Sequence, residues 1–186
     1  MKKIFFLDRD GVIIEDANYL SRPEQVKLCS GTPEAFRKIV EAGYEIIVVS
    51  NQSGIARGYF TEEDLAAVET HIESCLKDAG APLPLKWYYC PHHKKGSVPE
   101  YSVECDCRKP KPGLLLKAGK EFEIDYKNSF IIGDKLSDLE SGFAAGCGKG
   151  VLVLTGHGTE QELKELEKPY ETAPEILSAV NLLLND

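Results

Sequence analysis

Long apolar stretches are missing from this sequence of 186 residues. No run reaches the roughly 18 apolar residues that a membrane-spanning helix needs. The amino-terminal stretch is also too short for a signal sequence, because only a few apolar residues separate Lys3 from Asp8. We therefore expect a soluble, cytoplasmic protein that does not enter a membrane.

Positive charge is scarce as well. The chain has 22 Lys and Arg against 30 Asp and Glu, a net charge of −8, which is unfavourable for binding a nucleic-acid backbone. Internal repeats, low-complexity tracts and linkers are also absent, and a chain of this length can bury one good core. The sequence predicts a single domain over residues 1–186, acting as a monomer on a small molecule.

Apolar runs of strand length alternate with stretches of helical spacing. Buried strands are predicted at 4–7, 44–49, 85–89, 129–132 and 151–154, and helices are predicted to start near Thr32, Thr61, Gly113, Ser137 and Pro174. Strands separated by helices are typical of an α/β fold. We expect a doubly wound parallel sheet with right-handed crossovers.

The first strand ends in two aspartates one residue apart, Asp8 and Asp10, followed by Gly11. In an open parallel sheet, ligands bind at the carboxyl ends of the strands, which is where these carboxylates are predicted to lie. Side chains two residues apart on an extended chain point the same way and can share a small hard cation. A capped turn is the alternative, because Asp and Gly are also common in turns.

Polar residues follow other predicted elements in the same manner. Ser50 follows the second strand, Lys109 precedes a helix, and Asp134 follows the fourth strand. An acid pair, a hydroxyl, a lysine and a further acid are what a Mg²⁺-dependent phosphoryl-transfer site needs. Asp138 is either part of this set or only a helix-terminus acid.

The order of these residues resembles the haloacid dehalogenase superfamily of phosphatases. Longer stretches at 50–58, 89–93, 105–110 and 133–135 are similar to its heptose 1,7-bisphosphate 7-phosphatase family, and the resemblance runs over about residues 3 to 156. The sister family of histidinol-phosphate phosphatases shares the aspartates and the Cys/His set, and it is the alternative. The superfamily usually has Thr at the position of Val12.

This resemblance implies a Rossmann-like core without a cap domain, and removal of the C7 phosphate of a heptose bisphosphate during synthesis of nucleotide-activated heptose. It implies that Asp8 is the nucleophile and that Asp10 is first general acid and then general base. Ser50 and Lys109 would bind the transferring phosphoryl group, and Asp8, the backbone carbonyl of Asp10 and Asp134 would hold Mg²⁺. The implied substrate-binding residues are Asp16, Asn18, Tyr19, Asn51, Gln52, Ser53, Arg108 and Lys135.

An insertion at 90–107 has the pattern Cys90-x-His92-x12-Cys105-x-Cys107. Three thiolates and one imidazole suit a closed, tetrahedral, structural Zn²⁺ site. Spacing alone does not choose between His92 and His93, and the family resemblance selects His92. The alternatives are buried or disulfide-linked cysteines, or a zinc-binding interaction module on an inactive phosphatase fold.

A structural interpretation is the alternative for Lys135 and the expectation for His157 and three cysteines. Lys135 has a solvated surface lysine as its alternative, and His157, between two glycines, is interpreted as a flexible loop residue. Cys29, Cys75 and Cys147 are interpreted as small core residues.

Overall fold

The computed structural model describes residues 1–161, 166 and 169–185. Its central layer is a six-stranded sheet in the order β3-β2-β1-β4-β5-β6, in which neighbouring strands run parallel. The strands are β1 (Ile4–Leu7), β2 (Glu45–Asn51), β3 (Lys86–Cys90), β4 (Phe130–Gly133), β5 (Lys149–Val153) and β6 (Glu171–Ala173). The predicted doubly wound parallel fold is confirmed.

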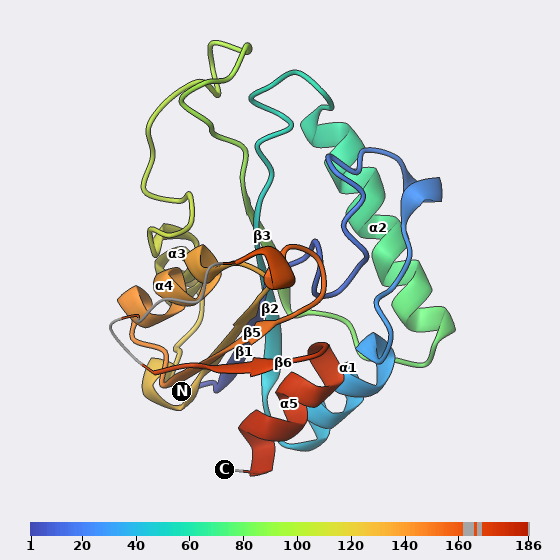
Figure 1. Cartoon of the computed structure of the whole chain (residues 1–186), viewed down its shortest axis with the longest axis vertical. Helices are drawn as coiled ribbons and strands as arrows, with labels where there is room; N and C mark the ends of the chain where they lie inside the picture. Colours follow the sequence, from blue (N-terminus) through green and yellow to red (C-terminus); the bar gives the residue numbers. More distant parts are fainter. Residues whose placement is uncertain (162–165, 167–168, 186) are drawn as a thin grey trace.

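Helices cover both faces of the sheet (Figure 1). On one face lie α1 (Thr32–Glu41), α2 (Glu62–Asp78) and α5 (Ile176–Asn185), and on the other lie α3 (Gly113–Glu121) and α4 (Leu136–Ala145). Short 3-10 turns occur at Pro23–Gln25, Tyr126–Asn128 and Gly158–Glu160.

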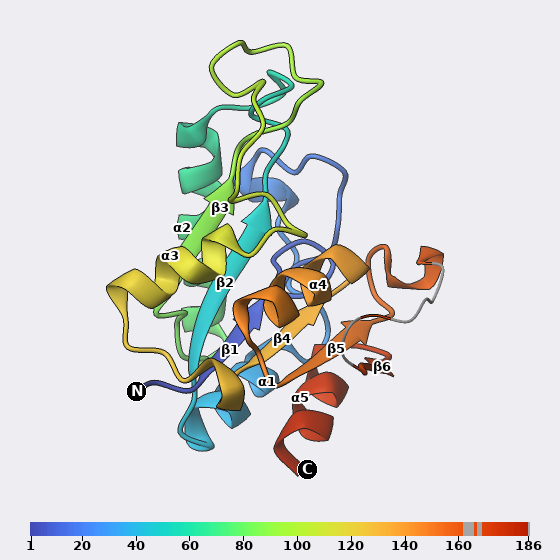
Figure 2. The same cartoon turned by 90° about the vertical axis from the view of Figure 1, so that its left-hand side faces the viewer.

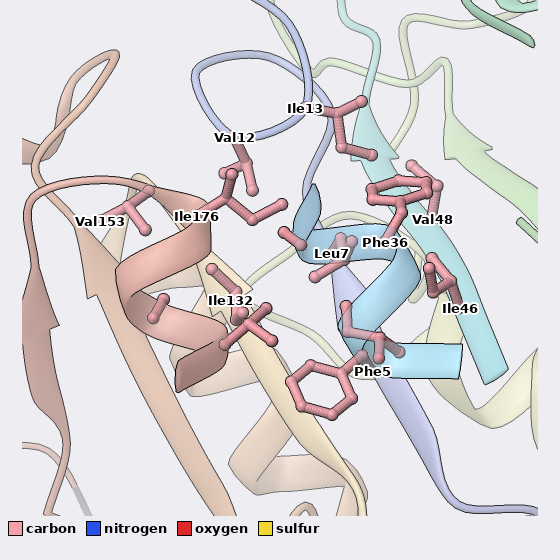
Figure 3. Close-up of a cluster of buried hydrophobic side chains, with 14 of the residues drawn as sticks. Phe5, Leu7, Val12, Ile13, Phe36, Ile46, Val48, Ile132, Val153 and Ile176 are labelled. Atoms are coloured by element: carbon pink, nitrogen blue, oxygen red, sulfur yellow. The ribbon is translucent and has the colours of Figure 1, made fainter. Parts of the chain in front are cut away.

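The core lies on both sides of the central strand β1. Phe5 and Leu7 pack towards α1 and α5, whereas Ile4 and Phe6 pack towards α3 and α4, and all four are fully buried. Figure 3 shows Phe5 and Leu7 among the buried side chains on the α1, α2 and α5 side of the sheet, a group that also contains Val12. Burial on both faces anchors β1 firmly, and so holds the residues that follow it in place.

Two sheet elements differ from the prediction. The edge strand β6 was not predicted. It has three residues, of which only Ala173 is buried, so its sequence shows almost no hydrophobic pattern of a strand. The second strand continues through Ser50 and Asn51, which pair with Tyr89 and Cys90 instead of following the strand. Helix α1 is also preceded by Gly31 as N-cap, with φ of 81°, and Thr32 is its first residue.

The segment between β3 and α3 forms a long loop at 91–112 without helix or strand. Figures 1 and 2 show it rising from the sheet edge beside the segment that follows β2. The backbone N–H groups of Ser97 and Val98 donate to the carbonyl of Ala56, at 2.8 and 3.0 Å. In the described part of the chain these loops stand in place of a separate cap domain.

No helix among the described residues is both long enough and apolar enough to span a bilayer.

Candidate active site

A cavity of about 410 Å³ opens at the carboxyl ends of the central strands. Its walls come from the loop after β1, the end of β2, the 91–112 loop and the start of α4. It is lined by Arg9, Asp10, Asp16, Asn18, Tyr19, Leu20, Asn51, Gln52, Ser53, Gly54, Arg108, Lys109, Lys135, Ser137 and His157. This set includes all eight residues predicted to bind substrate, although they come from four separate parts of the sequence.

Lys109 lies at the floor of this cavity in a buried ion-pair network. Its Nζ is 2.7 Å from Asp8 Oδ1, 2.7 Å from Asp138 Oδ1 and 2.7 Å from the carbonyl oxygen of Val49. Burial opposes the charge, but Asp138 and Asp8 outweigh it and raise the pKa of Lys109. The ammonium is therefore fully charged and fixed beside the predicted nucleophile.

Three carboxylates, those of Asp8, Asp134 and Asp138, have oxygens within 4.8 Å of one another. Burial and the neighbouring carboxylates raise the pKa of Asp8 to about 7 and that of Asp134 to about 6, against the opposing effect of Lys109. Asp134 is fully buried, and its Oδ1 has no hydrogen-bond partner in the described structure. A cluster of oxygen ligands with an unpartnered buried oxygen suits a hard divalent cation.

Two glycines allow the backbone to close over Asp134. Gly11 and Gly156 have φ of 79° and 54°, a region that favours glycine. A Cβ atom at either position would lie 2.7 or 2.5 Å from Asp134 Oδ2. That oxygen accepts the backbone N–H of His157 at 2.9 Å, which leaves Oδ1 for a cation.

Asp138 makes both of the contacts that the two interpretations of its sequence position predict. Its Oδ2 accepts the backbone N–H of Lys135 at 3.0 Å, as a helix-terminus acid does, and its Oδ1 pairs with Lys109. It is therefore both a capping residue of α4 and a part of the buried network.

Asp10 points to a different set of partners. Its Oδ1 is 2.8 Å from Arg9 Nη2, and its Oδ2 accepts from Gln52 Nε2 at 2.9 Å. Burial alone would raise the pKa of Asp10, but the Arg9 guanidinium and the Gln52 amide hold it below its usual range. Both carboxylate oxygens of Asp10 are thus engaged by neighbouring side chains, and the resemblance implies its backbone carbonyl as the metal ligand.

Asn51 and Arg108, which neighbour Ser50 and Lys109 in the sequence, make hydrogen bonds to the protein backbone. The side chain of Asn51 makes two hydrogen bonds to the backbone of Lys109, donating to its carbonyl at 3.2 Å and accepting its N–H at 3.1 Å. Arg108 Nη1 donates to the backbone carbonyl of His92 at 3.3 Å. Asn51 therefore positions the Lys109 backbone in addition to lining the cavity.

The loop after β1 reaches over the cavity in a strained conformation. Asn18 and Tyr19 have positive φ values of 49° and 60°, which are uncommon for residues other than glycine. The Asn18 N–H donates to Asp16 Oδ1 at 2.8 Å, and the Tyr19 ring meets the Tyr59 ring edge-on at 4.7 Å between centroids. These contacts hold the loop in place.

His157 belongs to the site, contrary to the prediction of a flexible loop residue. Its Nε2 lies 3.0 Å from Asp16 Oδ2 and its Nδ1 lies 2.9 Å from Glu160 Oε2. The Glu160 carboxylate, above all, raises the pKa of His157. The sequence offers no signal for this placement, because His157 and Asp16 are 141 positions apart in the chain.

The four predicted soft ligands meet beside the cavity. The sulfur atoms of Cys90, Cys105 and Cys107 lie 3.2 to 3.5 Å apart, and Nδ1 of His92 is 3.4 Å from Cys107 Sγ. The pKa of Cys107 is lowered to about 5, mainly by the hydrogen bond with Cys90. Neighbouring His93 faces Arg57 instead, with its Nε2 3.2 Å from Arg57 Nη2. The structure therefore selects His92 over His93 as the fourth member of a cluster that could hold a metal ion.

The remaining cysteines do not join this cluster. Cys29 and Cys147 are buried and Cys75 is half-buried, and none of the three forms a disulfide. Arg9 is the other residue that sequence reasoning missed: it is 1% exposed and lies between the two aspartates. A buried arginine needs partners, but the alternation that placed Asp8 and Asp10 together did not indicate which ones.

Comparison with known families supports a hydrolase of this type. Residues 106–179 match the family model described as HAD-hydrolase-like.

Named relatives cover most of the chain. It is 43% identical over 159 residues to a D-glycero-alpha-D-manno-heptose-1,7-bisphosphate 7-phosphatase of Photorhabdus laumondii, which covers 86% of each chain. It is 44% identical over 151 residues to the Escherichia coli K12 protein named for the beta anomer, covering 81% of this chain and 78% of that one.

A solved structure agrees with both. The crystal structure of D,D-heptose 1,7-bisphosphate phosphatase from B. bronchiseptica, complexed with magnesium and phosphate, superimposes with a TM-score of 0.83 at 28% identity, covering 98% of each chain.

Proposed function

The chain belongs to the D-glycero-D-manno-heptose 1,7-bisphosphate 7-phosphatase family of haloacid dehalogenase-like hydrolases, and we propose that it removes the C7 phosphate of this sugar bisphosphate. The observation that carries the proposal is the cavity itself. The eight residues implied by resemblance to bind substrate line one space, and Asp10 and Lys109 line it too. A cavity of about 410 Å³ lies in the range of small-molecule sites, roughly 300 to 1,000 Å³.

The proposed first step is attack by Asp8 on phosphorus. Asp8 Oδ1 is engaged by Lys109, so we assign Oδ2 as the attacking oxygen. As the new bond between this oxygen and phosphorus forms, the bond from phosphorus to the C7 oxygen breaks, and Asp10 gives a proton to that oxygen. Arg9 and Gln52 lower the pKa of Asp10 in the free protein, so Asp10 would take up this proton when the negative charge of the bound phosphate raises its pKa. The products of the step are an aspartyl-phosphate and the heptose 1-phosphate.

The second step releases orthophosphate. Asp10, now a carboxylate, takes a proton from water as the water oxygen attacks phosphorus, and the bond to Asp8 breaks. Ser50 would donate a hydrogen bond to a phosphoryl oxygen in both steps. The three donors of the Lys109 ammonium are taken by Asp8, Asp138 and Val49, so Lys109 would act on the phosphoryl group mainly through its positive charge. Asp8, Asp134 and the backbone carbonyl of Asp10 would hold Mg²⁺, which supplies positive charge that keeps Asp8 ionised and offsets charge on the phosphoryl oxygens.

Substrate selectivity is proposed to lie in the loops. Arg108 lines the cavity with a planar guanidinium, which suits a phosphate or vicinal hydroxyls at the far end of the sugar. A structural Zn²⁺ would hold the loop that carries Arg108 in position. Its ligands would be Cys90, His92, Cys105 and Cys107.

Phosphate release from both anomers of the heptose bisphosphate and from histidinol phosphate tests the proposal. We expect a kcat/KM about 100-fold or more higher for one heptose anomer than for histidinol phosphate, because the histidinol compound has no second anionic group for Arg108. The Asp8→Asn variant measures any contaminating phosphatase. A preference for histidinol phosphate would refute the assignment.

A further inference from the structure

Both N–H donors of the Gln52 amide are used within the protein. Its Nε2 donates to Asp10 Oδ2 at 2.9 Å and to Ser50 Oγ at 2.7 Å, and its Oε1 accepts from Arg9 Nη2 at 3.2 Å. An amide nitrogen has two protons, so both are accounted for. Gln52 is 4% exposed. It therefore has no donor left with which to contact a substrate.

Arg9 determines which way this amide faces. A guanidinium only donates hydrogen bonds, so the atom of Gln52 that faces Arg9 is the oxygen, and the nitrogen faces Asp10 and Ser50. Arg9 also contacts Asp10 Oδ1 through Nη2 at 2.8 Å and through Nε at 3.2 Å. Since Arg9 is 1% exposed, this arrangement has little freedom to rearrange.

The direction of the hydrogen bonds also orients Ser50. The Gln52 nitrogen can only donate, so the Ser50 oxygen is the acceptor and its own proton is free for another partner. A phosphoryl oxygen is the natural partner for that proton in the proposed reaction. One amide thus sets the orientation of the proton-transfer group and of a phosphoryl-binding hydroxyl together.

We propose that Gln52, oriented by buried Arg9, is a positioning residue that fixes Asp10 and Ser50 relative to each other, and that it donates no hydrogen bond to the substrate. This inference rests on the proposed function, because it takes Asp10 as the group that protonates the leaving oxygen. A displacement of the Asp10 carboxyl by about 1 Å is enough to lower the rate on the order of a hundredfold.

The test compares two leaving groups in a single turnover. A sugar alkoxide needs a proton as it leaves, whereas 4-nitrophenolate leaves without one, so only the sugar substrate depends on Asp10 in the first step. Gln52→Met keeps the length of the side chain and removes its hydrogen bonds. We expect the release of heptose 1-phosphate to slow by about 10- to 100-fold, because both Asp10 and Ser50 lose their orientation. The burst of 4-nitrophenolate should slow by only about threefold, because this substrate is affected through Ser50 alone.

Two further variants make the result specific. Ser53→Ala alters the next residue of the same segment, which lines the cavity but has no hydrogen bond to Asp10, and it should affect KM without this discrimination between leaving groups. Asp10→Asn is the reference for complete loss of the proton donor. Thermal unfolding of each variant checks that the fold is retained.

The outcomes distinguish the positioning role of Gln52 from the proton-donor role of Asp10 in the proposed reaction. If Asp10→Asn discriminates between the leaving groups and Gln52→Met slows both equally or neither, the positioning role is wrong while the proposed reaction stands. If Asp10→Asn itself fails to discriminate, the proton-donor role of Asp10 is wrong and the inference falls with it.

Discussion

The carboxylate cluster at the sheet edge and the Cys/His cluster beside it are both groups of metal-ligand side chains, but they are supported differently. Asp8 and Asp134 directly follow β1 and β4, two central strands with fully or nearly fully buried side chains. Cys90 ends β3, whereas His92, Cys105 and Cys107 lie in the 91–112 loop, which has no helix or strand. Central strands of the core hold the first cluster, whereas in the second only Cys90 belongs to the core, and Cys105 and Cys107 pack against its edge.

This difference decides what each cluster can control. The Lys109 ammonium is held by Asp8, Asp138 and Val49, and its backbone is held by Asn51. None of those contacts involves the Cys/His cluster. Arg108, in contrast, has its contact with the carbonyl of His92, inside that cluster. We therefore expect the Cys/His cluster to influence Arg108 more than Lys109.

The largest effect should come from breaking the sheet-edge cluster at its nucleophile. Asp8→Asn removes the attacking carboxylate, because an amide does not attack phosphorus, and we expect kcat to fall by about 10⁴-fold or more. The fold should be retained, since β1 is anchored by its buried side chains. Steady-state kinetics and thermal unfolding measure both. Near-normal turnover of this variant would rule out Asp8 as the nucleophile.

A smaller effect is expected at the far end of the cavity. Arg108→Ala should raise KM for the heptose bisphosphate by about 10- to 100-fold through loss of a charged bidentate contact, with less effect on an aryl phosphate. Kinetics with both substrates measure the ratio. Equal losses on the two would place Arg108 at the reacting phosphate instead.

Removing the proposed zinc should have a similar but weaker effect. Cys107→Ser loosens the loop that carries Arg108, so we expect KM to rise by about tenfold while kcat changes by only a few fold. Cys75→Ser, on α2 and outside the cluster, is the matched control. Metal analysis should give about one zinc per chain for the control, and limited proteolysis should cut the variant within 91–107. A large fall in kcat with unchanged KM would contradict the division between the two clusters.

The smallest effect concerns stability and pH. The pKa values of Asp8, about 7, and Asp134, about 6, lie above the value of about 3.9 for an unfolded chain. A carboxyl that binds its proton more tightly when folded loses stability as pH rises, here between about pH 4 and 7. Mg²⁺ at this cluster should offset that loss, so it should raise Tm at pH 8 by about 5 °C more than at pH 5.5. The Asp134→Asn variant should lose most of this response. An equal Mg²⁺ response at both pH values would argue against binding at these carboxylates.

Sequence alone indicated the layers of the fold and the types of side chain that meet in both clusters. Apolar runs such as Ile4 to Leu7 predict buried parallel strands, and the polar residues that end them fall at one edge of the sheet. The spacing of the three cysteines with a histidine predicted a metal cluster that the structure brings together. These features are local in the chain, or follow from strand order, so they are readable from pattern.

Tertiary structure alone decided the partners of the polar groups. The double role of Asp138, the buried position of Arg9 and the contact of His157 with Asp16 all depend on side chains distant in sequence. The short strand β6 is defined by pairing with β5 rather than by its own residues. Hydrophobic periodicity determines which face of an element is buried, whereas hydrogen bonds between loops depend on how the packed elements bring those loops together.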